Sequence, residues 1–402
     1  MPTNHILFVE KNGQILQQAM RSLTKEKPAW HIMHVTEAEA ALEIMQQYRI
    51  GVVVAECAKD WSDCEQKFNR FKQLDPATVR VALVSETDNK CRAGSFISIN
   101  QFLLASCAPV LLRQVLEDGL EIWGMAMTNP RMVELVANLK SIPTPPLLYF
   151  DIKDELDSPN GSLQGISGLI ARDPALTAKI LKIANSGLYA PPRSVTDLVM
   201  AIGLLGTDMV LALVLGAHLY NQLPVPGLDI DKMWLHSMAV SSVAKQIAED
   251  ETGDRQLASA AGVAGLLHDV GQLVLLAKDA AAYFGALHRC AGKEEKLVEM
   301  ERELFGVDHA ELGGYMLALW GLPENIVDAV SGHQGLISGM PHPLSTTVRA
   351  VYVAEWLLQE YVLHKELLIA CDAQDAQSVI YSSHAVQWWQ FVDRLVEQGI
   401  VT

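Results

Sequence analysis

The feature that most limits the fold of this chain is an almost wholly apolar run, Gly262–Leu276, with His268 and Asp269 at its centre. Such a run belongs inside a protein core, and a core rarely accepts an imidazole beside a carboxylate unless both groups have partners. Either the pair holds a metal ion, or hydrogen bonds satisfy it within a bundle of helices. The choice between these two interpretations decides whether the protein is an enzyme.

The charge balance and the length of the apolar runs narrow the set of partners. The 402 residues include 47 acidic and 31 basic ones, which gives a formal net charge of −16. Nucleic acids and anionic lipid surfaces both attract basic proteins, so we expect no nucleic-acid partner and no membrane partner. The longest apolar runs are shorter than the about 20 residues of a membrane-spanning helix.

The N-terminus and the cysteines indicate a cytoplasmic protein. Met1–Glu10 has no basic segment followed by a long apolar one, so no signal peptide is expected. The six cysteines form no CxxC pair. Cytoplasmic proteins keep their thiols reduced, and the sequence therefore predicts free cysteines.

The first 125 residues alternate short apolar runs with segments of helical spacing. This alternation predicts a doubly wound, five-stranded parallel sheet of the flavodoxin-like type, with helices on both faces. The expected strands are Ile6–Val9, His31–Val35, Val52–Ala55, Val79–Val84 and a region within Phe96–Leu104. The expected helices are Gln14–Leu23, Glu37–Gln47, Cys64–Leu74 and Val110–Trp123.

Functional groups of such sheets gather at the carboxyl ends of the strands. Glu10 follows the first strand, Glu56 the third, Ser85 the fourth and Ala105 the fifth. Over residues 1–125 this arrangement resembles the receiver domain of two-component response regulators. That family carries an acidic pair for Mg²⁺, a phosphate-accepting Asp, a Ser or Thr, and a Lys at these four places.

The chain departs from the receiver pattern at most of these positions. Lys11 interrupts the acidic pair, Glu56 replaces the phosphate-accepting Asp, and Ala105 replaces the Lys. Transfer of a phosphoryl group needs the metal and the Lys to offset its charge. Glu10, Glu56 and Ser85 are therefore interpreted as a degenerate phosphoacceptor site on a docking or dimerisation domain. Two alternatives stay open: Glu56 as a permanently charged substitute, and a regulator that is still phosphorylated.

The rest of the chain has helical spacing throughout. Residues 126–146 are interpreted as a linker helix and a proline-rich turn. Ser162, Asp173, Thr196 and Thr207 are expected to cap the helices that follow them. Two short helices around Gly206 have the layout of a DNA-binding helix-turn-helix. The second is too apolar to present side chains to a groove, so DNA binding is not expected.

Two motifs carry a second resemblance. The segment Ala171–Tyr189, ARDPALTAKILKIANSGLY, closely resembles the HDOD family, and so does AIGLLG at Ala201–Gly206. HDOD domains are all-helical relatives of the HD phosphohydrolases found in bacterial signalling proteins, where a receiver-like domain often precedes them. The resemblance implies an HDOD domain over residues 147–338, and we expect a C-terminal helical extension over 339–402.

The resemblance also implies a candidate metal site. HD hydrolases hold their metal with an early His, the His-Asp pair and a later Asp, and two-metal relatives of the HD-GYP type, which are cyclic-di-GMP phosphodiesterases, add further histidines. Imidazole and carboxylate ligands suit Fe, Mn, Zn or Mg, and a bound water then becomes the nucleophile. The matching positions in this chain are His236, His268, Asp269 and Glu355, with His309 and His333 as additional ligands.

Three departures from the hydrolase pattern favour a regulator. Glu355 is one methylene longer than the usual Asp, Gln272 stands where a Lys usually follows the pair, and no Gly-Tyr-Pro signature is present. The preferred hypothesis is a non-catalytic module that relays a signal to other signalling proteins or within a homodimer, its polar cluster fixing helix packing. The alternative is a metal-dependent phosphohydrolase acting on a nucleotide or cyclic dinucleotide.

Overall fold

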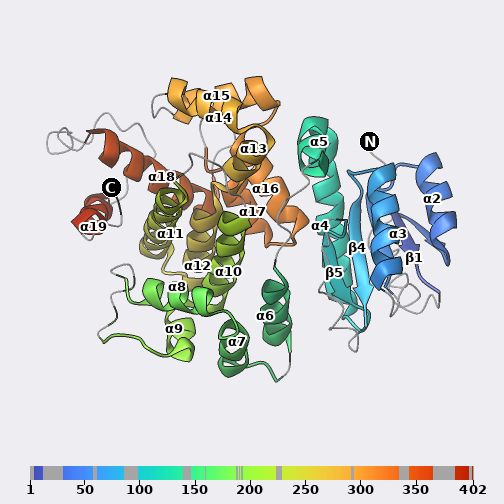
Figure 1. Cartoon of the computed structure of the whole chain (residues 1–402), viewed down its shortest axis with the longest axis horizontal. Helices are drawn as coiled ribbons and strands as arrows, with labels where there is room; N and C mark the ends of the chain where they lie inside the picture. The colour runs from blue at the N-terminus through green and yellow to red at the C-terminus, as the bar shows by residue number, and fades with distance from the viewer. Residues whose placement is uncertain are drawn as a thin grey trace. The chain divides into compact units, whose positions relative to one another are not determined.

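The computed structural model groups the chain into two compact units (Figure 1). Unit 1 comprises Met1–Thr144 and Tyr315–Leu322, and unit 2 comprises Pro145–Gly314 and Pro323–Thr402. The structure describes residues 4–11, 30–57, 61–85, 98–138, 146–158, 160–186, 189, 191, 193–222, 229–290, 294–334, 344–364, 385–397 and 401.

Unit 1 contains a parallel sheet with the strand order β2-β1-β3-β4-β5, the order of flavodoxin-like folds. This confirms the predicted fold class. Four expected strands are present, and the fifth is shorter than the region proposed for it. The strands are β1 (Asn4–Val9), β2 (Trp30–Val35), β3 (Val52–Glu56), β4 (Val79–Val84) and β5 (Gln101–Leu104).

Helices cover both faces of this sheet, because the central strands are apolar on both sides. Phe68 and Phe71 pack against one face, while Gly119 lies against Val52 on the other, where a Cβ atom would come within 2.8 Å of Val52 Cγ2. The expected helix Gln14–Leu23 lies outside the described residues. The described helices are α2 (Ala38–Gln47), α3 (Trp61–Leu74), α4 (Pro109–Thr128) and α5 (Pro130–Asn138).

The prediction of free thiols is wrong for one pair. Cys57, just after β3, and Cys64, in the first turn of α3, are joined by a disulfide. Their Cα atoms lie 5.3 Å apart, a separation that a disulfide can bridge. Cys107 and Cys290 are free among the described cysteines.

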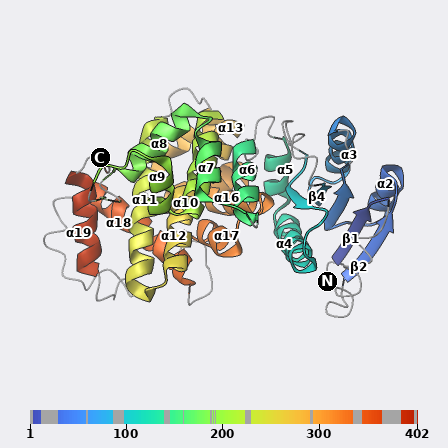
Figure 2. The ribbon, with the colours of Figure 1, turned by 90° about the horizontal axis from the view of Figure 1, so that it is seen from below.

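Unit 2 is helical, as predicted. Its central helix, α12, contacts α10, α11, α17 and α18 (Figure 2). The helices are α6 (Leu147–Asp157), α7 (Leu163–Ile170), α8 (Pro174–Ala184), α9 (Leu198–Leu205), α10 (Thr207–Gln222), α11 (Ile230–Thr252), α12 (Arg255–Leu267), α13 (Val270–Lys278), α14 (Ala280–Cys290), α15 (Glu294–Phe305), α16 (His309–Leu319), α17 (Glu324–Ser331), α18 (Thr346–His364) and α19 (Ala385–Glu397). The end of α16, from Tyr315 on, is grouped with unit 1.

Local chemistry sets several helix starts. Ser162 accepts a hydrogen bond from the Gly165 amide, and Asp173 caps α8 in the same way, as predicted. The cap of α9 was misplaced by one residue: Asp197, not Thr196, accepts from the Met200 amide. Thr207 is the first residue of α10 rather than its cap.

Two glycines let the helices of unit 2 approach each other closely. A Cβ atom at Gly265 in α12 would lie 2.8 Å from Ser241 Cα in α11. A Cβ atom at Gly271 in α13 would lie 1.9 Å from the carbonyl oxygen of His309 in α16. Backbone therefore packs on backbone on both sides of the His268-Asp269 pair.

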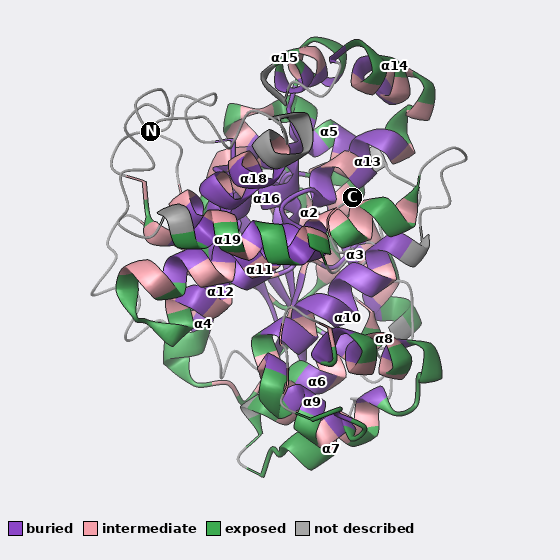
Figure 3. Cartoon of the chain, turned by 90° about the vertical axis from the view of Figure 1, so that its left-hand side faces the viewer, coloured by how far each residue is buried: buried purple, intermediate pink, exposed green. Residues whose placement is uncertain are grey.

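Within the described residues, one run, Arg255–Lys278, which spans α12 and α13, has the length and composition of a membrane-spanning helix. In its most apolar window, 89% of the residues are buried inside the protein. Helices α9 and α10 pass the same test only as a pair bent by 104°. Arg255–Lys278 thus behaves as a core segment, whereas α7 and α9 display exposed turns (Figure 3).

Candidate metal centre

Six side chains named from the sequence meet inside unit 2. They come from five separate parts of the helical chain, and most are almost completely buried. The six are His236 of α11, His268 and Asp269 between α12 and α13, His309 of α16, His333 after α17, and Glu355 of α18.

The first part of the cluster surrounds the carboxylate of Glu355. Its Oε2 atom lies 3.1 Å from His236 Nε2 and 3.3 Å from His268 Nε2. Asp269 Oδ2 lies 3.3 Å from His268 Nε2 and 3.9 Å from His236 Nε2. Two imidazoles and two carboxylates thus face one small volume.

The second part of the cluster uses the other oxygen of Asp269. His309 Nε2 lies 3.6 Å from Asp269 Oδ1 and 3.2 Å from His333 Nε2. The side-chain amide of Gln334 lies 2.9 Å from His333 Nε2 and 3.2 Å from His309 Nε2. Asp269 therefore belongs to both candidate ligand groups, one on each side of its carboxylate.

Backbone carbonyls fix the orientation of two of the imidazoles. His268 Nδ1 donates to the Gly265 carbonyl at 2.8 Å, and His333 Nδ1 donates to the Val330 carbonyl at 2.7 Å. A neutral imidazole that donates from Nδ1 carries its lone pair on Nε2. Both Nε2 atoms therefore point into the cluster as potential metal ligands.

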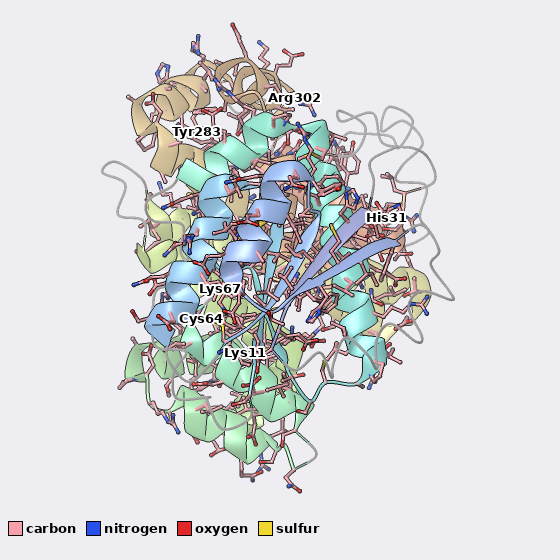
Figure 4. All side chains as sticks on the ribbon, turned by 90° about the vertical axis from the view of Figure 1, so that its right-hand side faces the viewer. Lys11, His31, Cys64, Lys67, Tyr283 and Arg302 are labelled. Atoms are coloured by element: carbon pink, nitrogen blue, oxygen red, sulfur yellow. A yellow bond between two sulfur atoms is a disulfide. The ribbon has the colours of Figure 1, made fainter. Side chains whose placement is uncertain are left out.

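A buried carboxylate fixes the third imidazole. Glu301 of α15 accepts from His309 Nδ1 at 2.7 Å and from the His309 amide at 2.9 Å, both at Oε2. Its Oε1 atom accepts from the Tyr283 hydroxyl at 2.6 Å. Tyr283 is labelled on α14 in Figure 4. This is the carboxylate–histidine arrangement that orients a metal ligand and raises its basicity.

Two atoms of the cluster lack a hydrogen-bonding partner. Among the described residues, His268 Nε2 and Glu355 Oε2 are buried and make no hydrogen bond. The Nδ1 proton of His268 is directed to Gly265, so in the neutral imidazole the lone pair of Nε2 faces a lone pair of Glu355 Oε2 across 3.3 Å. A cation between them removes this repulsion, and imidazole and carboxylate are suitable metal ligands. The residues present therefore fit a divalent metal ion.

In the absence of a metal, protons supply the positive charge. Burial opposes a charge on His236, but Glu355 outweighs it and raises the pKa of His236. Burial likewise opposes a charge on His268, whose pKa Asp269 and Glu355 raise well above its usual value. Burial, with nearby His268 and His309, lowers the pKa of His333 to about 3.

The carboxylates respond in the opposite direction. Burial favours their neutral forms, but the facing histidines outweigh it. His236 and His268 hold the pKa of Glu355 well below its usual value, and His268 and His309 lower the pKa of Asp269.

The cluster approaches solvent at its His236 edge. The side chain of His236 is 35% exposed, compared with 9% for Asp269 and Glu355 and at most 1% for the other three predicted ligands. A small molecule could therefore reach the first part of the cluster from the His236 side.

Four supporting residues were missed by sequence reasoning. Glu301, Tyr283 and Gln334 stand next to the second part, and Gln359 donates to Glu355 Oε1 at 2.9 Å. Gln272 was noted as a departure, and it donates to Asp269 Oδ1 at 2.7 Å. Of these, Gln359 could have been predicted, because side chains four residues apart on a helix are neighbours and Gln359 follows Glu355 at that spacing.

The predicted degenerate site of unit 1 lies at the carboxyl ends of its strands. Glu10 follows β1 and is 5% exposed, Glu56 ends β3, and Ser85 follows β4. The Lys11 amide donates to Glu56 Oε2 at 3.3 Å, and Lys67 Nζ donates to the Glu56 carbonyl at 2.6 Å. Lys67 had no signal in the sequence. Burial lowers its pKa, which Glu56 partly opposes.

Comparison with known families identifies the helical segment. Residues 142–336 match the HDOD domain model. The chain therefore contains an HDOD domain, which confirms that resemblance. The receiver resemblance is suggested by the five-stranded parallel sheet of unit 1.

The chain also resembles individual proteins. An uncharacterised protein of Treponema pallidum (strain Nichols) is 24% identical over 382 residues, which cover 86% of this chain and 72% of the relative. An HDOD domain protein of unknown function from Geobacter sulfurreducens is similar with a TM-score of 0.51 at 24% identity, over 68% of this chain and 96% of that one.

A proposed signal transduction protein of Marinobacter aquaeolei VT8 has a TM-score of 0.53 at 17% identity, over 82% of this chain and 80% of that one. At these identities the two structures support the fold alone.

Proposed function

We propose that the helical unit binds divalent metal ions and hydrolyses a phosphoester, with a nucleotide or cyclic dinucleotide as substrate, in a signalling pathway of the cytoplasm. One observation carries the proposal. The buried atoms His268 Nε2 and Glu355 Oε2 face each other at 3.3 Å without a hydrogen bond, inside a set of four imidazoles and two carboxylates.

The ligand set divides into two groups. Its nitrogen-rich composition favours Fe, Mn or Zn over Mg, which prefers oxygen ligands. One ion would be held by His236, His268, Asp269 and Glu355, and a second by Asp269, His309 and His333.

Divalent ions at this place would polarise a phosphoryl oxygen and lower the pKa of a water molecule. The side chains around them prepare the ligands for this chemistry. Glu301 keeps a proton on His309 Nδ1, and Gln272 holds one oxygen of Asp269. The partly exposed His236 gives a phosphoester a side from which to approach, and burial of the other ligands excludes bulk water.

A second candidate function is a non-catalytic signalling module. Gln272 supports it, because an amide offers no positive charge to a bound phosphate, and this amide already donates to Asp269. In this case the metal or the protonated cluster stabilises the helical unit. Signals then pass through contacts with other signalling proteins or a second copy of the chain, with unit 1 as a receiver-like domain that takes no phosphate.

Elemental analysis combined with an activity assay tests both candidates. The full-length protein would be purified after growth with Fe, Mn and Zn, then assayed on bis(p-nitrophenyl) phosphate and on a cyclic dinucleotide. We expect two ions per chain and hydrolysis that His268→Ala abolishes. His288→Ala changes an exposed histidine of α14 and is the matched control.

Each alternative outcome favours a different conclusion. Stoichiometric metal without hydrolysis of either substrate supports the non-catalytic module. Protein that contains no metal after this growth overturns the metal centre and the enzyme together.

A further inference from the structure

Unit 1 contains a pair of cysteines that takes no part in the metal centre. Cys57 and Cys64 are joined there, next to Glu56 at the carboxyl ends of the strands. We propose that these two cysteines form a reversible redox site, oxidised by a small-molecule or protein disulfide and reduced by a thiol. This proposal does not depend on the metal centre.

The fold brings the two sulfur atoms together. Cys57 directly follows the last residue of β3, and Cys64 lies in the first turn of α3. Their Cα atoms are 5.3 Å apart, and the side chains belong to the core between the sheet and α3. This Cα separation lies within the range that a disulfide bridges.

The bridge joins two elements that also meet at Glu56. The Cys57 amide donates to the Leu83 carbonyl of β4 at 2.8 Å, which fixes the strand side. Lys67, one helical turn after Cys64, donates to the Glu56 carbonyl at 2.6 Å, which fixes the helix side. Figure 4 labels Cys64, Lys67 and Lys11 at this edge. Breaking the disulfide would remove this covalent link and leave the Lys67–Glu56 hydrogen bond in place.

The position of the pair is suited to a signal. Doubly wound sheets place their functional groups where the strands end, and Cys57 of this pair stands one residue beyond the end of β3. The bond joins cysteines only seven positions apart in the sequence, so it constrains the unfolded chain less than a long-range disulfide would. Disulfides that occur in cytoplasmic proteins are usually catalytic or redox-sensing.

The chemistry balances with a disulfide as oxidant. One cysteine thiolate attacks the reagent disulfide R–S–S–R, forms a mixed disulfide and expels one thiolate. The second cysteine then attacks the protein sulfur of the mixed disulfide and expels the other. The protein loses two electrons and two protons, and the reagent becomes two R–SH molecules. Excess thiol reverses both steps.

Thiol mapping of the full-length protein tests the proposal. The protein would be equilibrated in buffers of reduced and oxidised glutathione, quenched with acid and alkylated. Trypsin cleavage after Lys59 puts Cys57 and Cys64 on separate peptides, Ile50–Lys59 and Asp60–Lys67, so the disulfide is detected as a linked pair.

We expect one reversible transition in which both thiols of the pair disappear together as the oxidised fraction rises. Cys107→Ser, at a free cysteine, leaves this transition unchanged, whereas Cys57→Ser and Cys64→Ser each remove it. The proposal is overturned if the peptides stay unlinked in excess oxidised glutathione. It is equally overturned if they stay linked in the folded protein under excess reduced glutathione.

Amide hydrogen exchange tests the structural consequence. Reduction should speed exchange at Lys11 and Cys57 by roughly fivefold or more, because the ties around Glu56 open locally. Val81 in the middle of β4 should not change. Identical exchange of Lys11 and Cys57 in the two redox states would contradict a signalling role for the pair.

Discussion

The two units carry polar sites that respond to sequence change in different ways. In unit 2, both residues that depart from the hydrolase pattern take part in hydrogen bonds with the cluster or its surroundings. Gln272 donates to Asp269, and Glu355 accepts from Gln359. The ligand atoms still converge. In unit 1, the departures at Glu56 and Ala105 leave a site whose cation, Lys67, comes from a different element and binds a backbone carbonyl.

This difference indicates what each site can still do. A metal centre tolerates a longer carboxylate, such as Glu355 in place of Asp, as long as the lone pairs of all its ligand atoms point to the same place. Transfer of a phosphoryl group needs particular charges at particular places. We therefore expect changes in unit 2 to alter chemistry strongly, and changes in unit 1 to alter local structure weakly.

The largest effect is expected at the carboxylate that both ligand groups share. Asp269→Asn removes the charge between the groups and should reduce bound metal from two ions to fewer than one. Hydrolysis should fall by about three orders of magnitude or more. Elemental analysis and initial rates measure the two effects.

Glu56→Gln is the matched control in unit 1 and should leave metal content and hydrolysis unchanged. If Asp269→Asn retained two ions, Asp269 would not be the shared ligand.

The next effect is expected at the buried support of His309. Glu301→Gln removes the charge that orients this imidazole and should weaken binding of the second ion by about 10–100-fold. The first ion should keep its affinity. Stepwise metal titration followed by calorimetry separates the two events.

Tyr283→Phe, which removes a single hydrogen bond to Glu301, should have a smaller effect in the same direction. Equal loss at both ions in Glu301→Gln would show a general disruption of the helical unit.

The third prediction concerns pH. Glu355 and Asp269 raise the pKa values of His236 and His268, so metal binding must displace protons from these imidazoles. Metal affinity should therefore fall as the pH decreases, by about tenfold per pH unit for each displaced proton. Metal titrations between pH 8 and 6 measure the slope. An affinity that does not change over this range would mean that neither histidine is a ligand.

In the metal-free protein, the pH dependence of folding stability should have the opposite sign: the histidine contribution is lost as the pH rises. Because the pKa values of His236 and His268 are raised on folding, their contribution to stability is present below about pH 6.5 and lost as pH rises through the folded values. Asp269 and Glu355, with lowered pKa values, contribute above about pH 4 and lose this contribution in acid. Denaturant unfolding of metal-free protein against pH tests the window.

The smallest effect is expected in unit 1. Lys67→Met removes the hydrogen bond to the Glu56 carbonyl and should lower the free energy of unfolding by about 0.5–1 kcal/mol. Metal content should not change. Urea unfolding with a probe in unit 1 measures the loss, and a loss of several kcal/mol would contradict the weak coupling expected for this site.

Much of the architecture could be predicted from the sequence. Apolar β-branched runs such as Val52–Ala55 identified the strands, and polar residues before apolar periodic segments, such as Ser162 and Asp173, identified helix starts. The division into receiver-like, linker, HDOD and extension segments, and the binding of metal, stay predictions. The six candidate ligands could be named because they stand at the positions of the hydrolase motifs along the chain. The structure brings all six together.

The missed residues lack such a pattern. Glu301 and Tyr283 reach His309 only because α14 and α15 fold against its helix, and no local periodicity encodes that contact. Cys57 and Cys64 were assigned as free because their spacing spans a strand end and a helix start rather than a CxxC turn. In each case tertiary packing, which the sequence does not display, determined the partner.

The close approaches at Gly265 and Gly271 have a consequence for how this protein can change over time. Each glycine touches the backbone of another helix, and those helices, α11 and α16, carry His236 and His309. The close approach of backbones at these two glycines therefore helps to set the distances between the ligands. A single added methyl group at either point would move a ligand-bearing helix while leaving every ligand in the sequence intact. A descendant could keep all six residues and still lose the centre.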